Sequence, residues 1–150
     1  MTQMKRILLV EDNPNDVELT IMALAEHHLA NEVVVTRDGA EALDYLHRRG
    51  PFQLREEGNP VVMLLDLKMP RVDGLSVLKE VRSDPNLKLI PIVLLTSSNE
   101  ESDILEGYNL GVNAYVVKPV DFHEFVDAIK KLGLFWSMLN VPPPAIALRK

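Results

Sequence analysis

Three carboxylates in this chain stand where an open α/β protein would place a catalytic or metal-binding group. Asp66 follows the apolar residues 61–65, and Glu11 and Asp12 follow the apolar residues 7–10. Carboxyl groups at the ends of buried parallel strands lie at the edge of the sheet where such folds carry out their chemistry. If the two strands are neighbours, the three acids converge on one crevice.

A hydroxyl group and an amine follow two further apolar runs. Residues 92–95 lead to Thr96, and residues 114–117 lead to Lys118. Four apolar runs therefore end in three acids, a hydroxyl and an amine. Packing alone does not explain this arrangement, so we expect a functional site.

The three acids would repel one another if they were brought together. Two carboxylates about 4 Å apart repel by roughly 4 kcal/mol at an effective dielectric constant of about 20. Lys118 offsets one charge and leaves about two, which matches a divalent cation. We expect Mg²⁺, which binds to one or two carboxylates together with waters and phosphate oxygens. With Asp66 as the nucleophile, the arrangement indicates formation of an aspartyl phosphate, with Thr96 and Lys118 contacting the phosphoryl oxygens.

Apolar runs and helical patterns alternate five times along the chain. Such alternation with short connections predicts a (βα)5 doubly wound α/β fold, with five parallel strands and helices on both faces. We expect strands at residues 6–10, 32–36, 61–65, 92–95 and 114–117. Typical helix-capping residues precede four of the helices: Asn13, Asp38, Ser98 and Asp121. The third helix should end near Asp84, and Tyr108 is among the apolar positions of the fourth.

Composition restricts the classes of function. The chain has 150 residues, a formal net charge of −6 and no cysteine. We expect no nucleic-acid partner, because no basic face is evident, and no membrane partner, because no apolar stretch approaches about 20 residues. The absence of cysteine fits a cytoplasmic location. We expect one domain at residues 1–140, a proline-rich tail at residues 141–150 and no further domain.

The four strand ends resemble the signatures of the two-component response-regulator receiver domain, a CheY-like family with the flavodoxin-like fold. The segments that carry the resemblance are 7–12, 64–74, 95–98 and 115–119, and the similarity spans about residues 5–132. Each motif alone is weak, but all four occur in order. The resemblance implies the family's strand order, 2-1-3-4-5, which is the known order of this fold.

The resemblance also implies the roles of the acids. Asp66 would accept a phosphoryl group from a histidine kinase or a phosphotransfer protein. Asp12, Asp66 and the main-chain carbonyl of Lys68 would bind Mg²⁺, and Glu11 would assist through water.

Four further residues take roles from the same resemblance. Thr96 and Tyr115 would form the switch pair, in which Tyr115 turns inward when Thr96 moves toward the phosphoryl group. Lys118 would contact the phosphate. Pro119 would follow a cis peptide bond.

Residues 135–139 include four large apolar side chains in a short segment: Phe135, Trp136, Met138 and Leu139. They could cover the core of their own chain or form a surface for self-association. We favour a homodimer with C2 symmetry, because a compact receiver already closes its core near Leu132 and the four residues would otherwise form an exposed patch.

Three functions are compatible with the site. We favour a stand-alone phosphoacceptor that switches protein-protein interactions and resembles the regulators paired with bacterial phytochrome-type histidine kinases. Its only chemistry would be self-catalysed phosphoryl transfer and autodephosphorylation, so we expect no enzyme. An aspartyl-nucleophile phosphatase normally needs a second acid two residues after Asp66, where Lys68 stands. A nucleotide-binding flavodoxin-like domain would need a glycine-rich loop after the first strand, which is absent.

Overall fold

A single parallel sheet of five strands forms the centre of the molecule. The computed structural model describes residues 6–26, 32–55, 58–67, 69, 72–96, 106–117 and 123. The strands are β1 (Arg6–Val10), β2 (Glu32–Thr36), β3 (Val62–Asp66), β4 (Ile92–Thr96) and β5 (Ala114–Val117). Their order is β2-β1-β3-β4-β5, and every neighbouring pair is parallel. The predicted fold is confirmed, with β3 shifted by one residue and β4 extended by one.

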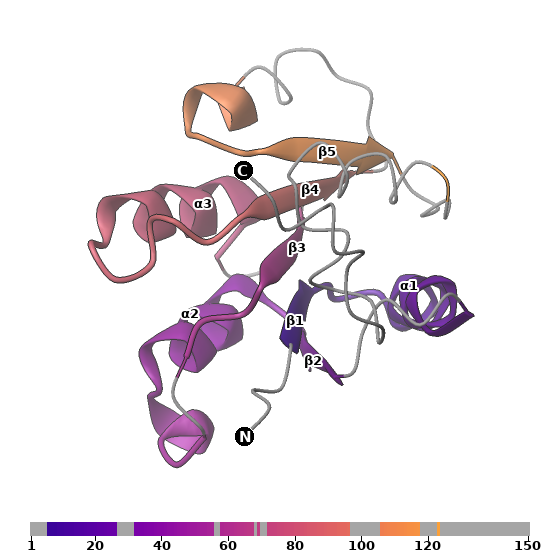
Figure 1. Cartoon of the computed structure of the whole chain (residues 1–150), viewed down its shortest axis with the longest axis horizontal. Helices are drawn as coiled ribbons and strands as arrows, with labels where there is room; N and C mark the ends of the chain where they lie inside the picture. The colour runs from indigo at the N-terminus through magenta and orange to yellow at the C-terminus, as the bar shows by residue number, and fades with distance from the viewer. Residues whose placement is uncertain are drawn as a thin grey trace, which may run out of the picture.

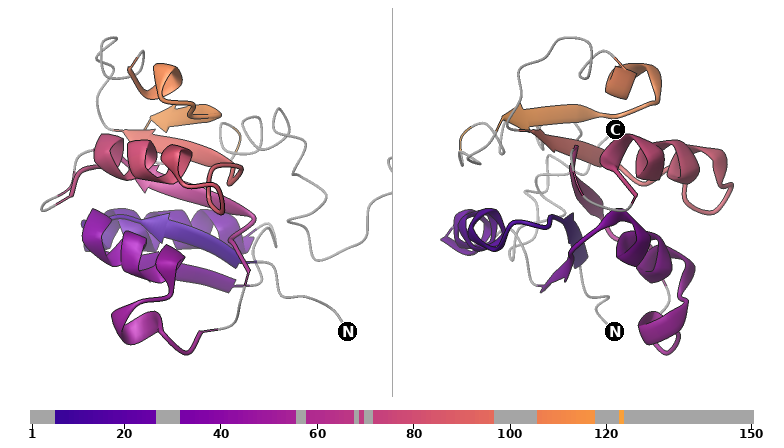
Figure 2. Two further views of the ribbon diagram at one scale, coloured as in Figure 1. Left: turned by 90° about the vertical axis from the view of Figure 1, so that its left-hand side faces the viewer. Right: turned by 180° about the vertical axis from the view of Figure 1, so that it is seen from behind.

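The helices cover both faces of this sheet. They are α1 (Pro14–Glu26), α2 (Gly39–His47), the short 3₁₀ helix η1 (Gly50–Phe52) and α3 (Gly74–Ser83), and the chain is helical again at 106–109. α1 lies on one face, and α2 and α3 lie on the other, together with the helical turn at 106–109 (Figure 1 and Figure 2).

The strands alternate between two core layers, one on each face of the sheet. In β1, Leu8 and Val10 belong to the layer beneath α2 and α3, whereas Ile7 and Leu9 belong to the layer beneath α1. All four side chains have no exposed surface. Because both faces of the central strands are covered, the sequence reads as continuous apolar runs with no polar alternation.

Side-chain caps fix the starts of the helices. Asp38 Oδ1 accepts a hydrogen bond from the Glu41 backbone N–H at 2.8 Å, and Asp73 Oδ1 accepts one from the Ser76 N–H at 2.9 Å. Asn13 Oδ1 accepts from two backbone N–H groups in the first turn of α1. Each cap satisfies donors that the helix itself cannot pair. The predicted caps at Asn13 and Asp38 are confirmed, while those at Ser98 and Asp121 lie outside the described residues.

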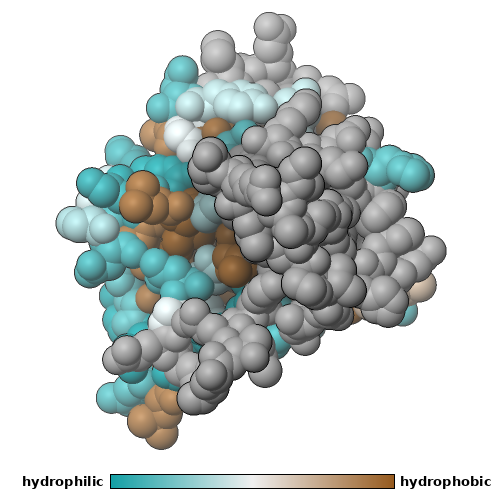
Figure 3. All heavy atoms as spheres, viewed as in Figure 1, coloured by the Kyte–Doolittle hydropathy of each residue, from teal (hydrophilic) through white to brown (hydrophobic). Residues whose placement is uncertain are grey.

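The long connection between α2 and β3 is held by a cation-π contact. The Arg55 guanidinium lies 4.2 Å from the centre of the Tyr45 ring, and its Nε donates to the Tyr45 carbonyl at 2.7 Å. Phe52 packs edge-on against Tyr45, with the ring centroids 5.2 Å apart. Burial lowers the pKa of the Arg55 guanidinium. Leu54 is 96% exposed, and Figure 3 shows hydrophobic atoms at the lower end of the molecule, where Figure 1 draws η1.

Arg82 joins the end of α3 to the starts of β4 and β5. Its Nε donates to the Gly111 carbonyl at 2.9 Å, and its Nη1 donates to the carbonyls of Lys88 and Ile90 at 2.7 and 2.8 Å. Its Nη2 donates to Asn113 Oδ1 at 2.9 Å. Burial lowers the pKa of this guanidinium. At Gly111, φ is +91°, a left-handed conformation in which side chains are strained.

None of the helices among the described residues is both long and apolar enough to cross a lipid bilayer.

Candidate functional site

The register of the sheet places the ends of β1 and β3 side by side. Val10 pairs with Leu65, so Glu11 and Asp66 follow at the same level. Carboxylate oxygens of Glu11, Asp12 and Asp66 all lie within 4.8 Å of one another. Within the described part of the chain, these residues form the one cluster of metal-binding side chains of this kind.

The three acids differ in their contact with solvent. Glu11 has no exposed surface and Asp66 is 4% exposed, whereas Asp12 is exposed. Two buried carboxylates beside an exposed one form a site that is anchored in the protein and open to solvent at one corner.

Glu11 is fixed by backbone groups on both of its sides. Its N–H donates to the Thr36 carbonyl at 3.0 Å, which ties the end of β1 to the end of β2. Its carboxylate accepts a hydrogen bond from the Asn13 backbone N–H at 3.2 Å, at the start of α1. The long Glu side chain is therefore folded back toward its own backbone and held there.

The segment after Asp66 is held against the start of α3. The Leu67 N–H donates to the Leu95 carbonyl at 3.0 Å, and the Gly74 N–H donates to the Leu67 carbonyl at 3.0 Å. A Cβ atom on Gly74 would overlap the Asp66 carbonyl oxygen and approach the Leu67 Cα to 2.9 Å. Gly74 is thus required for this close approach, in addition to following the capping residue Asp73.

The arrangement can bind a hard divalent cation. Three carboxylates within 4.8 Å supply oxygen ligands and more negative charge than neighbouring acids tolerate unaided. At an effective dielectric constant of about 20, a pair of buried carboxylates at such a separation repels by roughly 3 kcal/mol. A divalent cation offsets that repulsion, and oxygen ligands are those that Mg²⁺, Mn²⁺ and Ca²⁺ prefer.

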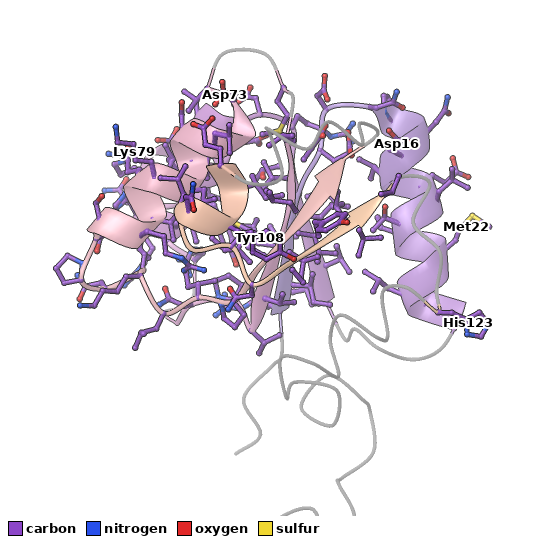
Figure 4. All side chains as sticks on the ribbon, turned by 90° about the horizontal axis from the view of Figure 1, so that it is seen from above. Asp16, Met22, Asp73, Lys79, Tyr108 and His123 are labelled. Atoms are coloured by element: carbon purple, nitrogen blue, oxygen red, sulfur yellow. The ribbon has the colours of Figure 1, made fainter. Side chains whose placement is uncertain are left out.

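Thr96 lies at the same edge of the sheet as the acids. It is the last residue of β4, one position beyond Leu95, the partner of Asp66. Its backbone pairs with Val117, the residue before Lys118. Figure 4 shows that Asp73, just before α3, lies toward the same end of the sheet as Asp16 in the first turn of α1.

Tyr115 is exposed on β5 and packs against Tyr108. The rings are nearly perpendicular, with centroids 6.2 Å apart, and the exposed fractions are 40% for Tyr115 and 46% for Tyr108. Burial, and then the proximity of Tyr115, raises the pKa of the Tyr108 phenol. Tyr108 is at an apolar position of the predicted fourth helix but lies at the surface, because its ring rests on Tyr115 at the edge strand.

Several predicted site residues lie outside the described residues: Lys68, Lys118, Pro119, Phe135, Trp136, Met138 and Leu139. Two contacts near the acids were not predicted from the sequence, namely the Asn13 backbone donor and the close approach at Gly74. A signal for the second was available, since Asp-Gly occurs twice, at residues 38–39 and 73–74, each time at a helix start.

Residues 7–130 match the family model described as the response regulator receiver domain. The chain belongs to that family. It is 36% identical over 141 residues to the response regulator Rcp1 of Synechocystis sp., covering 94% of this chain and 95% of Rcp1.

Solved structures of response regulators share the fold of this receiver domain. The bacteriophytochrome response regulator RtBRR is 63% identical, with a TM-score of 0.84 over 95% of this chain and 86% of RtBRR. The phosphorylated cyanobacterial phytochrome response regulator RcpA is 40% identical, with a TM-score of 0.76 over 95% of this chain and all of RcpA. The Mn²⁺-bound form of Rcp1 is 35% identical, with a TM-score of 0.74 over 94% of this chain and 99% of Rcp1.

Proposed function

We propose that this receiver domain accepts a phosphoryl group on Asp66 and thereby switches its interactions with other proteins. The observation that carries the proposal is the cluster of three carboxylates within 4.8 Å, with Asp66 buried at the end of a central strand. The phosphorylated state of the similar protein RcpA supports it.

The chemistry requires an ionised carboxylate beside groups that stabilise the transferred charge. A carboxylate oxygen of Asp66 forms the bond to phosphorus while the bond between phosphorus and the donor's leaving group breaks. When the donor is a phosphohistidine, the imidazole nitrogen keeps the electron pair and takes up a proton. Thr96 and Lys118 then contact the phosphoryl oxygens, as the family resemblance implies.

Mg²⁺ is the proposed cofactor, held by Asp12, Asp66 and the Lys68 carbonyl, with Glu11 assisting through water. The bound ion supplies positive charge that offsets the carboxylates and the phosphoryl oxygens. The three-carboxylate donor set supports this assignment, as does the Mn²⁺-bound form of the similar protein Rcp1.

We propose a histidine kinase or a phosphotransfer protein as the source of the phosphoryl group, and a phytochrome-type sensor kinase as the specific one. The similarity to response regulators named for phytochromes supports this partner. Because such kinases use cytoplasmic ATP, we propose a cytoplasmic location for this chain as well.

The proposed readout includes a homodimer. Thr96 and Tyr115 form the proposed switch pair. The proposed dimer surface consists of Phe135, Trp136, Met138 and Leu139. We retain the proposed division into a receiver at residues 1–140 and a tail at 141–150. If Trp136→Ala changed neither the sedimentation velocity nor the concentration dependence of thermal unfolding, the tail would pack on its own chain.

Incubation with acetyl phosphate and Mg²⁺ tests the central proposal. We expect the wild-type chain to gain one phosphoryl group by intact mass, and peptide mapping should place it on Asp66. Asp66→Asn should gain none. Asp73→Asn is the matched control, because asparagine also caps a helix, and it should be modified as the wild type is.

The same experiment separates the alternative functions. Multiple turnover on diverse phosphate esters would favour an aspartyl phosphatase. Modification at a residue other than Asp66 would overturn the proposal.

A further inference from the structure

The turn between β2 and α2 is braced by hydrogen bonds within itself. We call residues 36–39 the β2–α2 corner. The Arg37 N–H donates to Glu41 Oε1 at 2.7 Å, and the Glu41 N–H donates to Asp38 Oδ1 at 2.8 Å. The Ala42 N–H donates to the Asp38 carbonyl at 3.1 Å. The reciprocal side-chain bonds satisfy the N–H groups of Arg37 and Glu41 and restrict the conformation of the corner.

One end of the β2–α2 corner contacts the first acid of the cluster. The Thr36 carbonyl accepts the hydrogen bond from the Glu11 N–H at 3.0 Å. Thr36 has no exposed surface, and its hydroxyl donates to the Leu9 carbonyl at 3.3 Å. The position of Glu11 is therefore tied to a buried threonine on the neighbouring strand.

The other end of the corner contacts Val72, which lies two residues before Gly74. A Cβ atom on Gly39 would overlap the Val72 carbonyl oxygen and approach the Val72 Cβ to 2.8 Å. Gly39 is the first residue of α2 and has no positive φ. Glycine is therefore needed there for the closeness of the two backbones, and not for an unusual conformation.

We propose that the β2–α2 corner is a positioning element of the metal site, although none of its side chains is a ligand. It contacts Glu11 through Thr36 and Val72 through Gly39, and Val72 leads into Gly74, which is hydrogen-bonded to the residue after Asp66. The corner therefore influences the spacing between acids carried by two different strands. The inference rests on the proposed function, because it assigns to the corner the geometry of the proposed Mg²⁺ site. Edge strand β2, which carries no acid of the cluster, thereby acquires a role in metal binding.

Gly39→Ala tests this positioning role. The added methyl group must push against Val72, two residues before Gly74, whose N–H is hydrogen-bonded to the carbonyl of Leu67, the residue after Asp66. We therefore expect it to alter the position of Asp66 relative to Glu11. We expect the Kd for Mg²⁺, measured by isothermal titration calorimetry without a phosphoryl donor, to rise about tenfold or more, as supporting residues of metal sites typically give. The measurement is made well below the unfolding temperature, so lowered stability alone leaves the Kd unchanged.

Ala40→Gly is the matched control. It lowers the stability of the same turn of α2 through the greater conformational freedom of glycine. It keeps the hydrogen bonds among Arg37, Asp38 and Glu41 and places no atom against Val72. We expect a lower unfolding temperature and a wild-type Kd for Mg²⁺.

Glu41→Ala keeps the proposal testable if Gly39→Ala does not fold. It removes the acceptor of the Arg37 N–H and loosens the corner without a steric clash, so we expect a severalfold higher Kd for Mg²⁺. A wild-type Kd in a folded Gly39→Ala chain would overturn the inference, as would a wild-type Kd in Glu41→Ala where Gly39→Ala is unfolded.

The phosphorylation experiment decides the proposed function separately. In either of the two cases above, continued phosphorylation of the wild type on Asp66 would leave the proposed function intact. Absence of that phosphorylation would instead contradict the proposed function, and the Mg²⁺ titrations would still decide the role of the corner.

Discussion

The two ends of the sheet use charge in opposite ways. At the carboxyl edge, where β1 and β3 end, Glu11, Asp12 and Asp66 bring like charges within 4.8 Å of one another. At the amino edge, where β4 and β5 begin, a single cation, Arg82, donates four hydrogen bonds to groups on two loops. The first arrangement costs free energy in the absence of a cation, and the second contributes to the free energy of folding.

This difference shows that one edge of the sheet carries the groups for chemistry, whereas the other stabilises the fold. Strands that run in parallel bring all their carboxyl ends to one edge, so residues for chemistry can be gathered there without disturbing the opposite edge. We therefore expect substitutions at the carboxyl edge to change phosphoryl transfer and metal binding, and substitutions at the amino edge to change stability. Three experiments test that division, and a fourth concerns the tyrosine pair outside both edges. They follow in order of decreasing expected effect.

Asp66→Asn should abolish phosphorylation. The amide is no nucleophile toward phosphorus, and among the described residues Asp66 is the one carboxylate at the end of β3. Circular dichroism should show a folded chain, because asparagine has nearly the same volume. Intact mass spectrometry after acetyl phosphate treatment measures the loss. A modified Asp66→Asn chain would show that the acceptor lies elsewhere.

Arg82→Met should lower the free energy of unfolding by about 2–4 kcal/mol, because it leaves several carbonyls at the amino edge without their donor. Urea unfolding measures the loss. Lys79→Met is the control, since Lys79 is exposed on the same helix, and it should change stability by less than about 0.5 kcal/mol. The Kd for Mg²⁺ should be unchanged in both variants, and a large rise for Arg82→Met would contradict the division between the edges.

Glu11→Gln should raise the free energy of unfolding of the metal-free chain by about 1 kcal/mol, because one of three neighbouring charges is removed. Glutamine still offers an oxygen to the Asn13 N–H, so the local hydrogen bond is retained. The Kd for Mg²⁺ should rise in the same variant. Glu18→Gln, at an exposed position of α1, is the control. A less stable Glu11→Gln chain in the absence of metal would show that the acids are not mutually repulsive.

The smallest effect is expected at the tyrosine pair, which belongs to neither edge. Because the fold raises the pKa of Tyr108 above its usual value near 10, its neutral form contributes stability below pH 10. That contribution is lost as the pH rises through 10 toward the folded pKa. Tyr115→Phe removes the neighbouring phenol and should move the Tyr108 titration slightly downward, as measured by phenolate absorbance in a Tyr45→Phe background. An upward movement would show that Tyr115 does not contribute to the shift.

The strands could be predicted because they depend on local pattern, and the convergence of the acids could be expected once the family resemblance implied that the first and third strands are neighbours. Five apolar runs with acids at two of their ends define a parallel sheet and one of its edges, and β1, β2 and β5 have the predicted bounds. The caps at Asn13 and Asp38 were predictable for the same reason, since a cap depends on residues three positions apart.

The contacts that brace the site could not be predicted in the same way. Gly39 and Val72 are far apart in the sequence, and only the folded chain shows that their backbones touch. Arg82 likewise finds its acceptors up to 31 residues away, and the sequence gives no sign of which arginine would do so. Which residues form these long-range contacts depends on their tertiary neighbours. The folded structure shows these contacts, whereas the periodicity of the sequence does not.

The sheet also acts as a partition between two core layers. Alternate residues of each central strand enter one layer or the other, so side chains beneath α1 do not share a cavity with side chains beneath α2 and α3. Double substitutions on opposite sides should therefore have nearly additive effects on stability, whereas pairs within one layer should not. Substitutions can therefore accumulate in one core layer without affecting the other layer, and the acids at the carboxyl edge of the sheet keep their positions.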